Sequence, residues 1–186
     1  MSKSIPPAGR LFVVSAPSGG GKTSLIKAAL ERVSGVRVSV SFTTRAQRPG
    51  EVHGQHYYFV SQAQFEAKIQ AGDMLEYAKV FDHYYGTSAS AIQEALAEGL
   101  DVVLDIDWQG ARQIRSHFGP QQTSIFILPP SLLILRQRLK ARGQDADEVI
   151  DYRMGQAKTE LQHLAEYDFL IVNEDFETAT QGLHAI

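Results

Sequence analysis

The chain has 186 residues, 44% of them hydrophobic, and a formal net charge of -3 at pH 7. This length supports one substantial core, so we expect a single domain with smaller lobes. The charge excludes an overall cationic field for nucleic acid or an anionic membrane, and the absence of cysteine excludes disulfides, thiolate zinc sites and a cysteine nucleophile. The N-terminus lacks an apolar signal core, and no apolar run approaches the ~18 residues of a membrane span. We therefore expect a soluble, cytoplasmic monomer or homo-oligomer that binds neither nucleic acid nor membrane.

Apolar and β-branched runs alternate with segments of helical period, which predicts an α/β fold with a mostly parallel sheet covered by helices. The predicted strands are, in chain order, Arg10 to Ser15, Val36 to Phe42, Val102 to Asp105, Thr123 to Leu128 and Phe169 to Val172. Between the second and third strands, residues 45–85 carry turn residues, the aromatic run HYYFV and a helix that opens at Ser61 with Gln64 at the capping-box spacing. This segment predicts an inserted α+β lobe.

Residues 131–167 predict two further helices. Ser131 is placed to cap the first, and Gly143 to end it. Asp145 with Glu148 has the spacing of a capping box for the second helix. The connecting RGQDAD indicates a mobile helical hairpin.

The stretch SAPSGGGKTSL, residues 15–25, joins the first strand to a helix. A phosphate loop needs glycines, so that backbone N–H groups can approach the phosphates, and a helix N-terminus with its positive dipole end. Ala16 stands where the pattern G-x-x-x-x-G-K-[ST] has glycine, and it suffices if its φ is negative. We predict that Lys22 contacts the transferred phosphates and that the Thr23 hydroxyl ligates Mg²⁺. The alternative is a glycine-rich turn with an exposed lysine. The predicted loop residues are Ala16, Pro17, Ser18, Gly19, Gly20, Gly21, Lys22, Thr23 and Ser24.

The stretch VVLDID, residues 102–107, predicts a buried strand that ends in a carboxylate. Ligands of open α/β sheets lie at the carboxyl ends of the strands, so we expect Asp105 and Asp107 to point toward the nucleotide. Asp105 is therefore a second candidate Mg²⁺ ligand beside Thr23. It could instead cap the following helix, and the two roles can coexist.

Two pairs of arginines indicate anion binding. Arg45 and Arg48 lie on a turn that ends in Pro49-Gly50 and can aim two forked guanidinium groups at one phosphate. Arg138 and Arg142 are one helical turn apart, so they repel each other unless an anion lies between them. For this second pair the alternative is a solvated basic face.

The motifs TTR, RPGEVHG, a tyrosine shortly after, LEYA, YYGT and LDIDWQGA occur in this order, and the chain closely resembles the guanylate kinase family from about Gly9 to Asp175. The resemblance implies a P-loop NTPase-type three-layer fold and Mg²⁺-dependent transfer of the ATP γ-phosphoryl group to GMP in purine nucleotide metabolism. It also implies a longer C-terminal helix than the residues after Asp175 provide. The implied parts are a core of 9–43, 88–130 and 168–186, a GMP-binding lobe of 44–87 and a lid of about 131–167.

The resemblance also implies roles for single residues. Tyr57 and Tyr85 would add hydroxyl donors to the acceptor phosphate, and Asn173 would lie near the adenine. Guanine presents N1–H and N2–H donors that a carboxylate such as Glu76 accepts in pairs, while a hydroxyl such as Thr87 can donate to O6. Glu76 alone could also be a solvated strand carboxylate. The implied GMP-binding set is Ser41, Arg45, Arg48, Glu51, Tyr57, Glu76, Tyr85, Thr87, Asp105 and Asp107, and the implied catalytic set is Lys22, Arg45, Arg138, Arg142 and Arg153.

Three other functions are compatible with parts of this pattern. A catalytically silent guanylate-kinase-like module would bind phosphopeptides, but this chain keeps Gly21-Lys22-Thr23, Asp105 and the lid arginines that ATP chemistry needs. A kinase for another nucleoside monophosphate would differ in the base it reads. A GTPase switch is disfavoured because no N-K-x-D stretch follows the strands.

Overall fold

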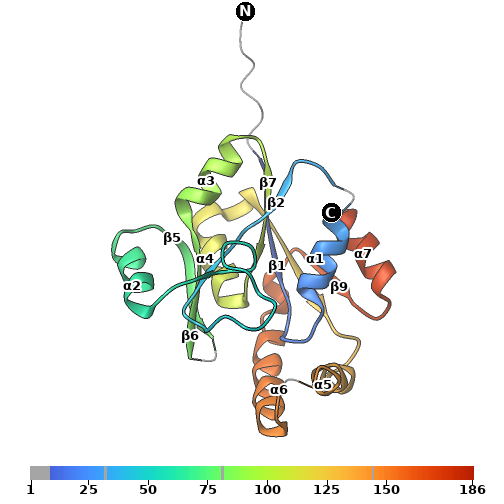
Figure 1. Ribbon diagram of the computed structural model, residues 1–186. Coiled ribbons are helices and arrows are strands. Elements are labelled where there is room, and N and C mark those ends of the chain that lie inside the picture. Colours follow the sequence, from blue (N-terminus) through green and yellow to red (C-terminus); the bar gives the residue numbers. More distant parts are fainter. Residues whose placement is uncertain (1–8, 32, 81, 144) are drawn as a thin grey trace, which may run out of the picture. The chain divides into compact units, whose positions relative to one another are not determined.

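The computed structural model describes residues 9–31, 33–80, 82–143 and 145–186 (Figure 1). Its strands form a five-stranded sheet of order β2-β7-β1-β8-β9 and a four-stranded sheet of order β4-β3-β6-β5. The strands are β1 (Leu11–Ser15), β2 (Val36–Val38), β3 (Phe42–Thr43), β4 (Tyr58–Phe59), β5 (Met74–Val80), β6 (His83–Ser88), β7 (Asp101–Asp105), β8 (Gln122–Leu128) and β9 (Phe169–Val172). The helices are α1 (Lys22–Leu30), α2 (Gln62–Gln70), α3 (Ala89–Ala97), α4 (Trp108–Phe118), α5 (Leu132–Ala141), α6 (Asp147–Leu161) and α7 (Phe176–His184), with short 3-10 turns η1 (Gly119–Gln121) and η2 (Leu164–Glu166). None of the helices in these ranges has the length and apolarity needed to cross a membrane.

The chain divides into two compact units. The first contains the described residues of Met1–Phe12, Gly35–Leu104 and Gln109–Gln122, and the second those of Val13–Ser34, Asp105–Trp108 and Thr123–Ile186. The sequence predicts a GMP-binding lobe of 44–87 and a lid of about 131–167. These ranges differ from the two units and stay predictions.

The five-stranded sheet is built from apolar strands. β2 pairs with β7, and β8 pairs with β9, each in parallel. Val13, Leu104 and Phe126 from the inner strands are completely buried, as expected when helices cover both faces of a parallel sheet. All five predicted strands begin within one residue of their predicted starts, and four of them are single elements as predicted.

The predicted strand Val36 to Phe42 is wrong as a single element. β2 ends at Val38, and the bond from Ser39 N to Val103 O is 2.9 Å long. β3 then belongs to the other sheet, where Phe42 stacks on Tyr58 with ring centroids 4.7 Å apart. The apolar run continues through the break because both pieces need β-forming residues, although they pack in different sheets.

Residues 45–85, for which the sequence predicts α+β structure, contain α2 and most of the four-stranded sheet. β5 and β6 pair antiparallel, and β3 runs antiparallel to β6. Ser61 and Gln64 form the predicted capping box: Gln64 N donates to Ser61 Oγ at 3.3 Å and Ser61 N to Gln64 Oε1 at 2.9 Å. Phe65 of α2 is buried and stacks on Tyr84, so the helix lies beside β6 (Figure 1).

α5 and α6 form a hairpin whose shared core is Leu135, Leu139, Ile150 and Ala157. Ser131 caps α5 as predicted, by accepting a bond from Ile134 N at 3.2 Å.

The predicted capping box of Asp145 and Glu148 is wrong. α6 begins at Asp147, and its N-cap, Ala146, makes no side-chain bond. The Asp145 carboxylate accepts a bond from Arg153 Nη2 at 3.1 Å. An ion pair with a distant arginine thus replaces the local cap.

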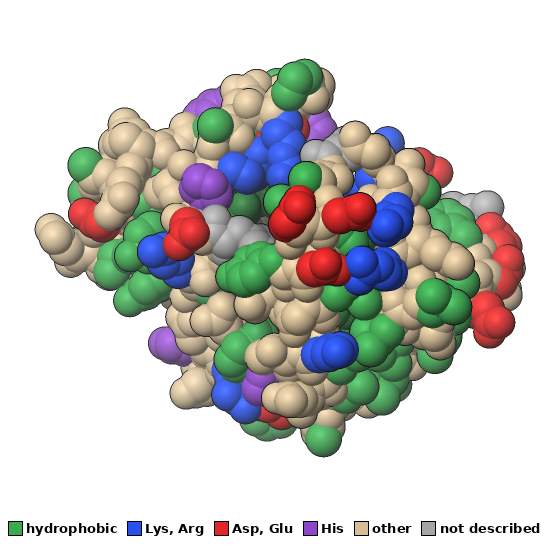
Figure 2. All heavy atoms as spheres, turned by 90° about the horizontal axis from the view of Figure 1, so that it is seen from below, with side chains coloured by type: hydrophobic (Ala, Val, Ile, Leu, Met, Phe, Trp, Pro, Cys, Tyr) green, Lys and Arg blue, Asp and Glu red, His purple; other side chains and the backbone are tan. Residues whose placement is uncertain are grey.

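Charged side chains of both signs are interspersed on the face shown in Figure 2. Red and blue spheres lie close together among polar and apolar ones, and no broad surface of one sign covers this face. This distribution agrees with the small net charge of -3.

Candidate active site

The phosphate loop between β1 and α1 has the geometry that an anion site requires. Gly19 and Gly21 have φ of 93° and 92°, which glycine adopts without the strain of a side chain. Gly21 is the N-cap of α1 and makes no side-chain capping bond, so the N-cap residue itself does not compete with an anion for the first N–H groups of the helix. In the described residues Asp82 is the only non-glycine residue with positive φ, so Ala16 meets its predicted condition.

Lys22, Thr23 and Asp105 lie together at the start of α1 and the end of β7. Lys22 Nζ is 2.6 Å from Asp105 Oδ1 and donates to Ile106 O at 3.0 Å. Thr23 Oγ1 donates to Asp105 Oδ2 at 3.0 Å. A hydroxyl and a carboxylate are hard oxygen ligands of the kind that divalent cations prefer. These residues therefore fit a divalent cation.

Asn173, which follows β9, binds the backbone of the phosphate loop. Its side chain is buried and donates from Nδ2 to Gly20 O at 2.8 Å. A Cβ on Gly21 would lie 2.4 Å from the same Nδ2, so the loop and Asn173 are in close contact. Here Asn173 contacts the loop backbone, whereas the resemblance implies a place near the adenine.

The predicted lid arginines have different environments. Arg153 of α6 donates from Nη1 to Ser18 Oγ in the loop at 3.1 Å, and Arg138 of α5 donates from Nη2 to Asn173 O at 2.8 Å. Arg142 is the exposed C-cap of α5. The structure thus brings Arg138 and Arg153 to the loop and its support, and leaves Arg142 at the surface.

Behind the loop lies a carboxylate that the sequence did not single out. Burial raises the pKa of Glu160 to about 7, with Lys22 acting to lower it and Asp107 to raise it further. Burial also raises the pKa of the nearby Tyr167 hydroxyl, which stays protonated. Beside them, the indole of Trp108 stacks on the imidazole of His163, with centroids 3.8 Å apart. Asp107 lies in this donor-side unit.

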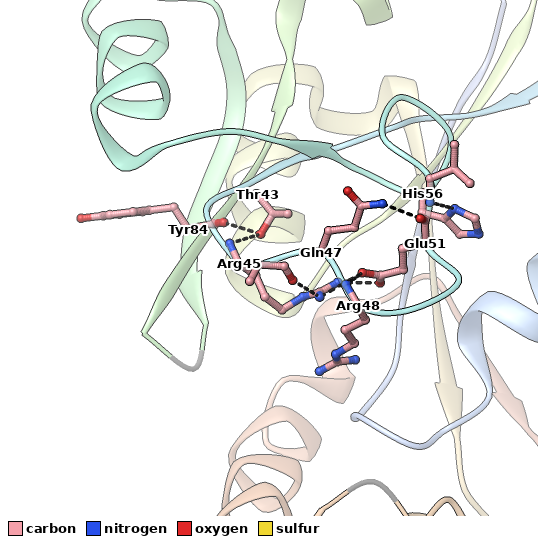
Figure 3. Close-up of polar contacts among 9 residues, drawn as sticks. Thr43, Arg45, Gln47, Arg48, Glu51, His56 and Tyr84 are labelled. Atoms are coloured by element: carbon pink, nitrogen blue, oxygen red, sulfur yellow. Dashed lines mark hydrogen bonds and ion pairs between the residues drawn. The ribbon is translucent and has the colours of Figure 1, made fainter.

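In the first unit, Arg45 and Arg48 lie on the turn after β3 with Glu51 between them, and we call these three residues the cradle (Figure 3). Arg45 binds Glu51 through two parallel bonds, Nη2 to Oε1 at 2.7 Å and Nη1 to Oε2 at 3.0 Å. Glu51 Oε2 also accepts a bond from Arg48 N at 2.7 Å. The Arg45 guanidinium lies 5.5 Å from the ring centroid of Tyr57, which makes a T-shaped contact with Tyr85. Four of the predicted phosphate-binding residues and Glu51 are therefore gathered on one turn and its neighbouring strand.

The ion pair sets the charges of this cradle. Hydrogen bonding by Arg45 holds the pKa of Glu51 below its usual value, despite partial burial. Burial acts to lower the pKa of Arg45, but the hydrogen bond with Glu51, the neighbouring Tyr85 and the charge of Glu51 raise it overall. The Arg48 side chain is exposed and points away from Glu51 (Figure 3). Thr43 supports the turn by accepting a bond from Arg45 N at 3.1 Å, a contact that sequence spacing does not predict.

A buried polar chain crosses the four-stranded sheet. Thr87 and Glu76 are cross-strand partners on β6 and β5, and Thr87 Oγ1 donates to Glu76 Oε1 at 2.7 Å. Ser41 Oγ lies 3.3 Å from Thr87 Oγ1, and the three residues are 8%, 1% and 3% exposed for Ser41, Thr87 and Glu76. Glu76 is therefore no solvated strand carboxylate. In this arrangement the Thr87 proton is directed to Glu76.

Comparison with known proteins identifies the family. The model of the guanylate kinase family matches residues 8–186. The chain belongs to the guanylate kinase family. It is 58% identical to the guanylate kinase of Sodalis glossinidius over 96% of this chain and 86% of that protein, and 57% identical to that of Escherichia coli (strain K12) over the same shares. It is 54% identical to that of Idiomarina loihiensis over 97% of this chain and 87% of that protein.

A solved guanylate kinase has the same fold. The crystal structure from Anaplasma phagocytophilum matches with a TM-score of 0.81 at 34% identity, covering 98% of this chain and 86% of that one. These matches confirm the predicted family, the α/β fold with a mostly parallel central sheet, and the enzyme class, a nucleoside monophosphate kinase. The roles of single residues stay predictions.

Proposed function

We propose that the protein transfers the γ-phosphoryl group of ATP to GMP, giving ADP and GDP, with Mg²⁺ as the cation. An oxygen of the GMP phosphate attacks the γ-phosphorus, and the bond from this phosphorus to the β,γ-bridging oxygen breaks. No general base is needed because the acceptor phosphate is already an anion near neutral pH. The protein then has to align the two phosphates and stabilise charge.

The donor side rests on the loop and the lid arginines. The N–H groups at the start of α1 and the Lys22 ammonium would hold the ATP phosphates. Thr23 and Asp105 would hold Mg²⁺, which supplies charge neutralisation on the phosphates. Arg138 and Arg153 already reach the loop and its support, so small side-chain movements would turn them toward a phosphoryl group.

The acceptor side rests on the cradle of Arg45 and Arg48. Glu51 repels a phosphate, so we assign it to positioning: it fixes the Arg45 fork and the Arg48 backbone, and the phosphate would meet the exposed Arg48 side chain beside them. Tyr57 and Tyr85 would add hydroxyl donors beside them.

The buried chain of Ser41, Thr87 and Glu76 is the observation that carries the choice of guanine. Thr87 donates to Glu76 Oε1 and so fixes the buried carboxylate, whose oxygens have the polarity to accept from guanine N1–H and N2–H. Adenine has an acceptor at N1. With AMP the buried Glu76 carboxylate would therefore face a lone pair and lose its hydrogen bond, which disfavours AMP. Since Thr87 donates to Glu76, the Ser41 hydroxyl is the better placed donor toward O6.

A coupled assay of ADP formation tests this function. We expect turnover with GMP and little with AMP, CMP or dTMP. The isosteric Glu76→Gln variant keeps the Thr87 bond but presents an amide, so its kcat/KM for GMP should fall about ten- to a hundredfold, the loss of one charged hydrogen bond. Equal turnover of AMP and GMP by the wild type would sink the proposal. A phosphopeptide-binding module would bind GMP without forming ADP.

A further inference from the structure

The loop after the cradle, residues 51–59, is held by two imidazoles. Val52 N donates to His56 Nδ1 at 2.9 Å, as drawn in Figure 3, and Phe59 N donates to His53 Nδ1 at 3.2 Å. A backbone N–H can only donate, so both Nδ1 atoms must be unprotonated. Each ring is therefore neutral and keeps its proton on Nε2.

These two bonds brace the segment that connects the cradle residues. Val52 follows Glu51 directly, and an isolated bridge joins His53 to Tyr57. Gly54 N donates to Tyr57 O at 2.9 Å, and His56 N donates to Val52 O at 3.0 Å. The imidazoles thus fix both ends of the loop between the carboxylate that orients Arg45 and the ring of Tyr57.

Both histidines are exposed, and within the described ranges neither forms an ion pair. From β4, the rings of Tyr58 and Phe59 lie 5.6 and 6.3 Å from His53.

The charged groups nearby are already engaged or lie further away. On the loop itself, the carboxylate of Glu51 is engaged with Arg45 and the Arg48 side chain is a cation. Behind Tyr58, Phe42 carries Lys68 over its ring, and Lys68 is paired with Asp73 of the turn after α2. Protonation would therefore set an N–H against a backbone N–H without a new acceptor.

We propose that His53 and His56 are positioning residues for the acceptor phosphate, which order the cradle loop only while their imidazoles are neutral. The proposal rests on the proposed function, because it assumes that the cradle binds GMP. Histidine changes its charge between about pH 5 and 8. A ring that carries a proton on Nδ1 cannot accept the bond from Val52 N or Phe59 N. GMP affinity should therefore fall with pH more steeply than the protonation of GMP itself explains.

Asparagine provides a matched test, because its Oδ1 occupies the place of Nδ1, accepts the same N–H and does not titrate. The variants are His53→Asn/His56→Asn, His53→Ala/His56→Ala and, as a control from the same lobe, His83→Asn. KM and kcat for GMP are measured at saturating ATP at pH 7.5 and 5.8, and GMP binding is measured by calorimetry. Thermal melts of all variants check that they fold.

At pH 7.5 we expect the Asn variant and the His83→Asn control to bind GMP as the wild type does, within about twofold. The Ala variant loses both bonds, but at exposed positions where water can replace them, so its KM for GMP should rise roughly three- to tenfold with a smaller change in kcat. At pH 5.8 the wild type and the control should lose GMP affinity by a further three- to tenfold relative to the Asn variant. Protonation of the GMP phosphate affects every variant equally.

Two results would overturn the inference. One is a wild-type KM in a folded Ala variant, and the other is a single pH profile shared by the wild type and the Asn variant. If the Ala variant does not fold, the pH comparison of the Asn variant decides alone. Failure of the wild type to bind GMP at pH 7.5 would instead contradict the proposed function.

Discussion

Glu160 shows how the position of one carboxylate on a helix decides its ionisation. Arg153 and Ala157 precede it on α6 by about two turns and one turn, so the three residues share one face. Arg153 reaches Ser18, and Ala157 is buried. Glu160 therefore faces inward behind the loop, where burial raises its pKa to about 7.

This pKa predicts that Glu160 destabilises the fold at alkaline pH. The unperturbed value is 4.5, so the stabilisation from protonated Glu160 is complete below pH 4.5 and lost as the pH rises through about 7. The Gln side chain of Glu160→Gln does not titrate. The free energy of unfolding of this variant minus that of the wild type should therefore increase from pH 5 to pH 8, by on the order of 2 kcal/mol. Urea denaturation at both pH values measures this. Glu148→Gln, on an exposed side of α6, is the control, and an equal effect of Glu160→Gln at both pH values would contradict the prediction.

At the scale of elements, the α5–α6 hairpin is joined to the phosphate loop by packing as well as by arginine bonds. A Cβ on Gly19 would lie 3.0 Å from Leu139 Cδ2 and 3.1 Å from Leu135 Cδ1. Both leucines are completely buried in the hairpin core. The residues that place Arg138 are therefore the same residues that press against the loop.

Leu139→Ala should destabilise the protein by about 2–5 kcal/mol, the range for a buried leucine that leaves a cavity. Leu133 on the same helix is 66% exposed, so Leu133→Ala should change stability by less than about 0.5 kcal/mol. Thermal or urea denaturation compares the two. Similar losses in both variants would show that α5 contributes little packing at Leu139.

The starts of α2 and α5 could be predicted from the sequence because Ser61 and Ser131 act on N–H groups three residues away. The start of α6 could not, because the Asp145 carboxylate binds Arg153, eight residues away, and not the N–H groups at the start of the helix.

The same division holds in the candidate site. Lys22, Arg45 and Glu76 can be proposed as site residues from the sequence because their chemistry is tied to residue type and motif, and the family follows from the same motifs. Glu160 and the bracing histidines cannot, because burial and a backbone N–H partner arise only in the folded chain.

At the scale of the whole molecule, the donor and acceptor residues fall into different compact units. Lys22, Asp105 and Arg153 belong to the second, and Arg45 and Glu76 to the first. The ion pairs of these residues form within one unit: Lys22 pairs with Asp105 in the second, and Arg45 pairs with Glu51 in the first. Binding of either nucleotide can therefore be weakened without loss of the other.

We expect Lys22→Met to reduce kcat by about 10²–10³-fold, as removal of one group that stabilises transition-state charge does. Its Kd for GMP should stay within about twofold of the wild type, since none of the cradle contacts changes. Glu76→Gln should show the reverse, with weakened GMP binding and unchanged ATP binding. Calorimetry with each nucleotide measures both. Loss of GMP affinity in Lys22→Met would show that the two sets of residues are not independent.

The contact between Gly21 and Asn173 restricts how the sequence can vary. The amide of Asn173 reaches the loop across 153 positions of chain, and it lies where a side chain at position 21 would have to go. A larger residue at 21 would need a shorter one at 173, and that change would remove the bond to Gly20 O. A side chain at 21 is excluded by this overlap, whereas a shorter residue at 173 alone loses a buried hydrogen bond without a clash. The two positions are therefore expected to drift very slowly, and in a redesign of this enzyme they should be kept or exchanged as a unit.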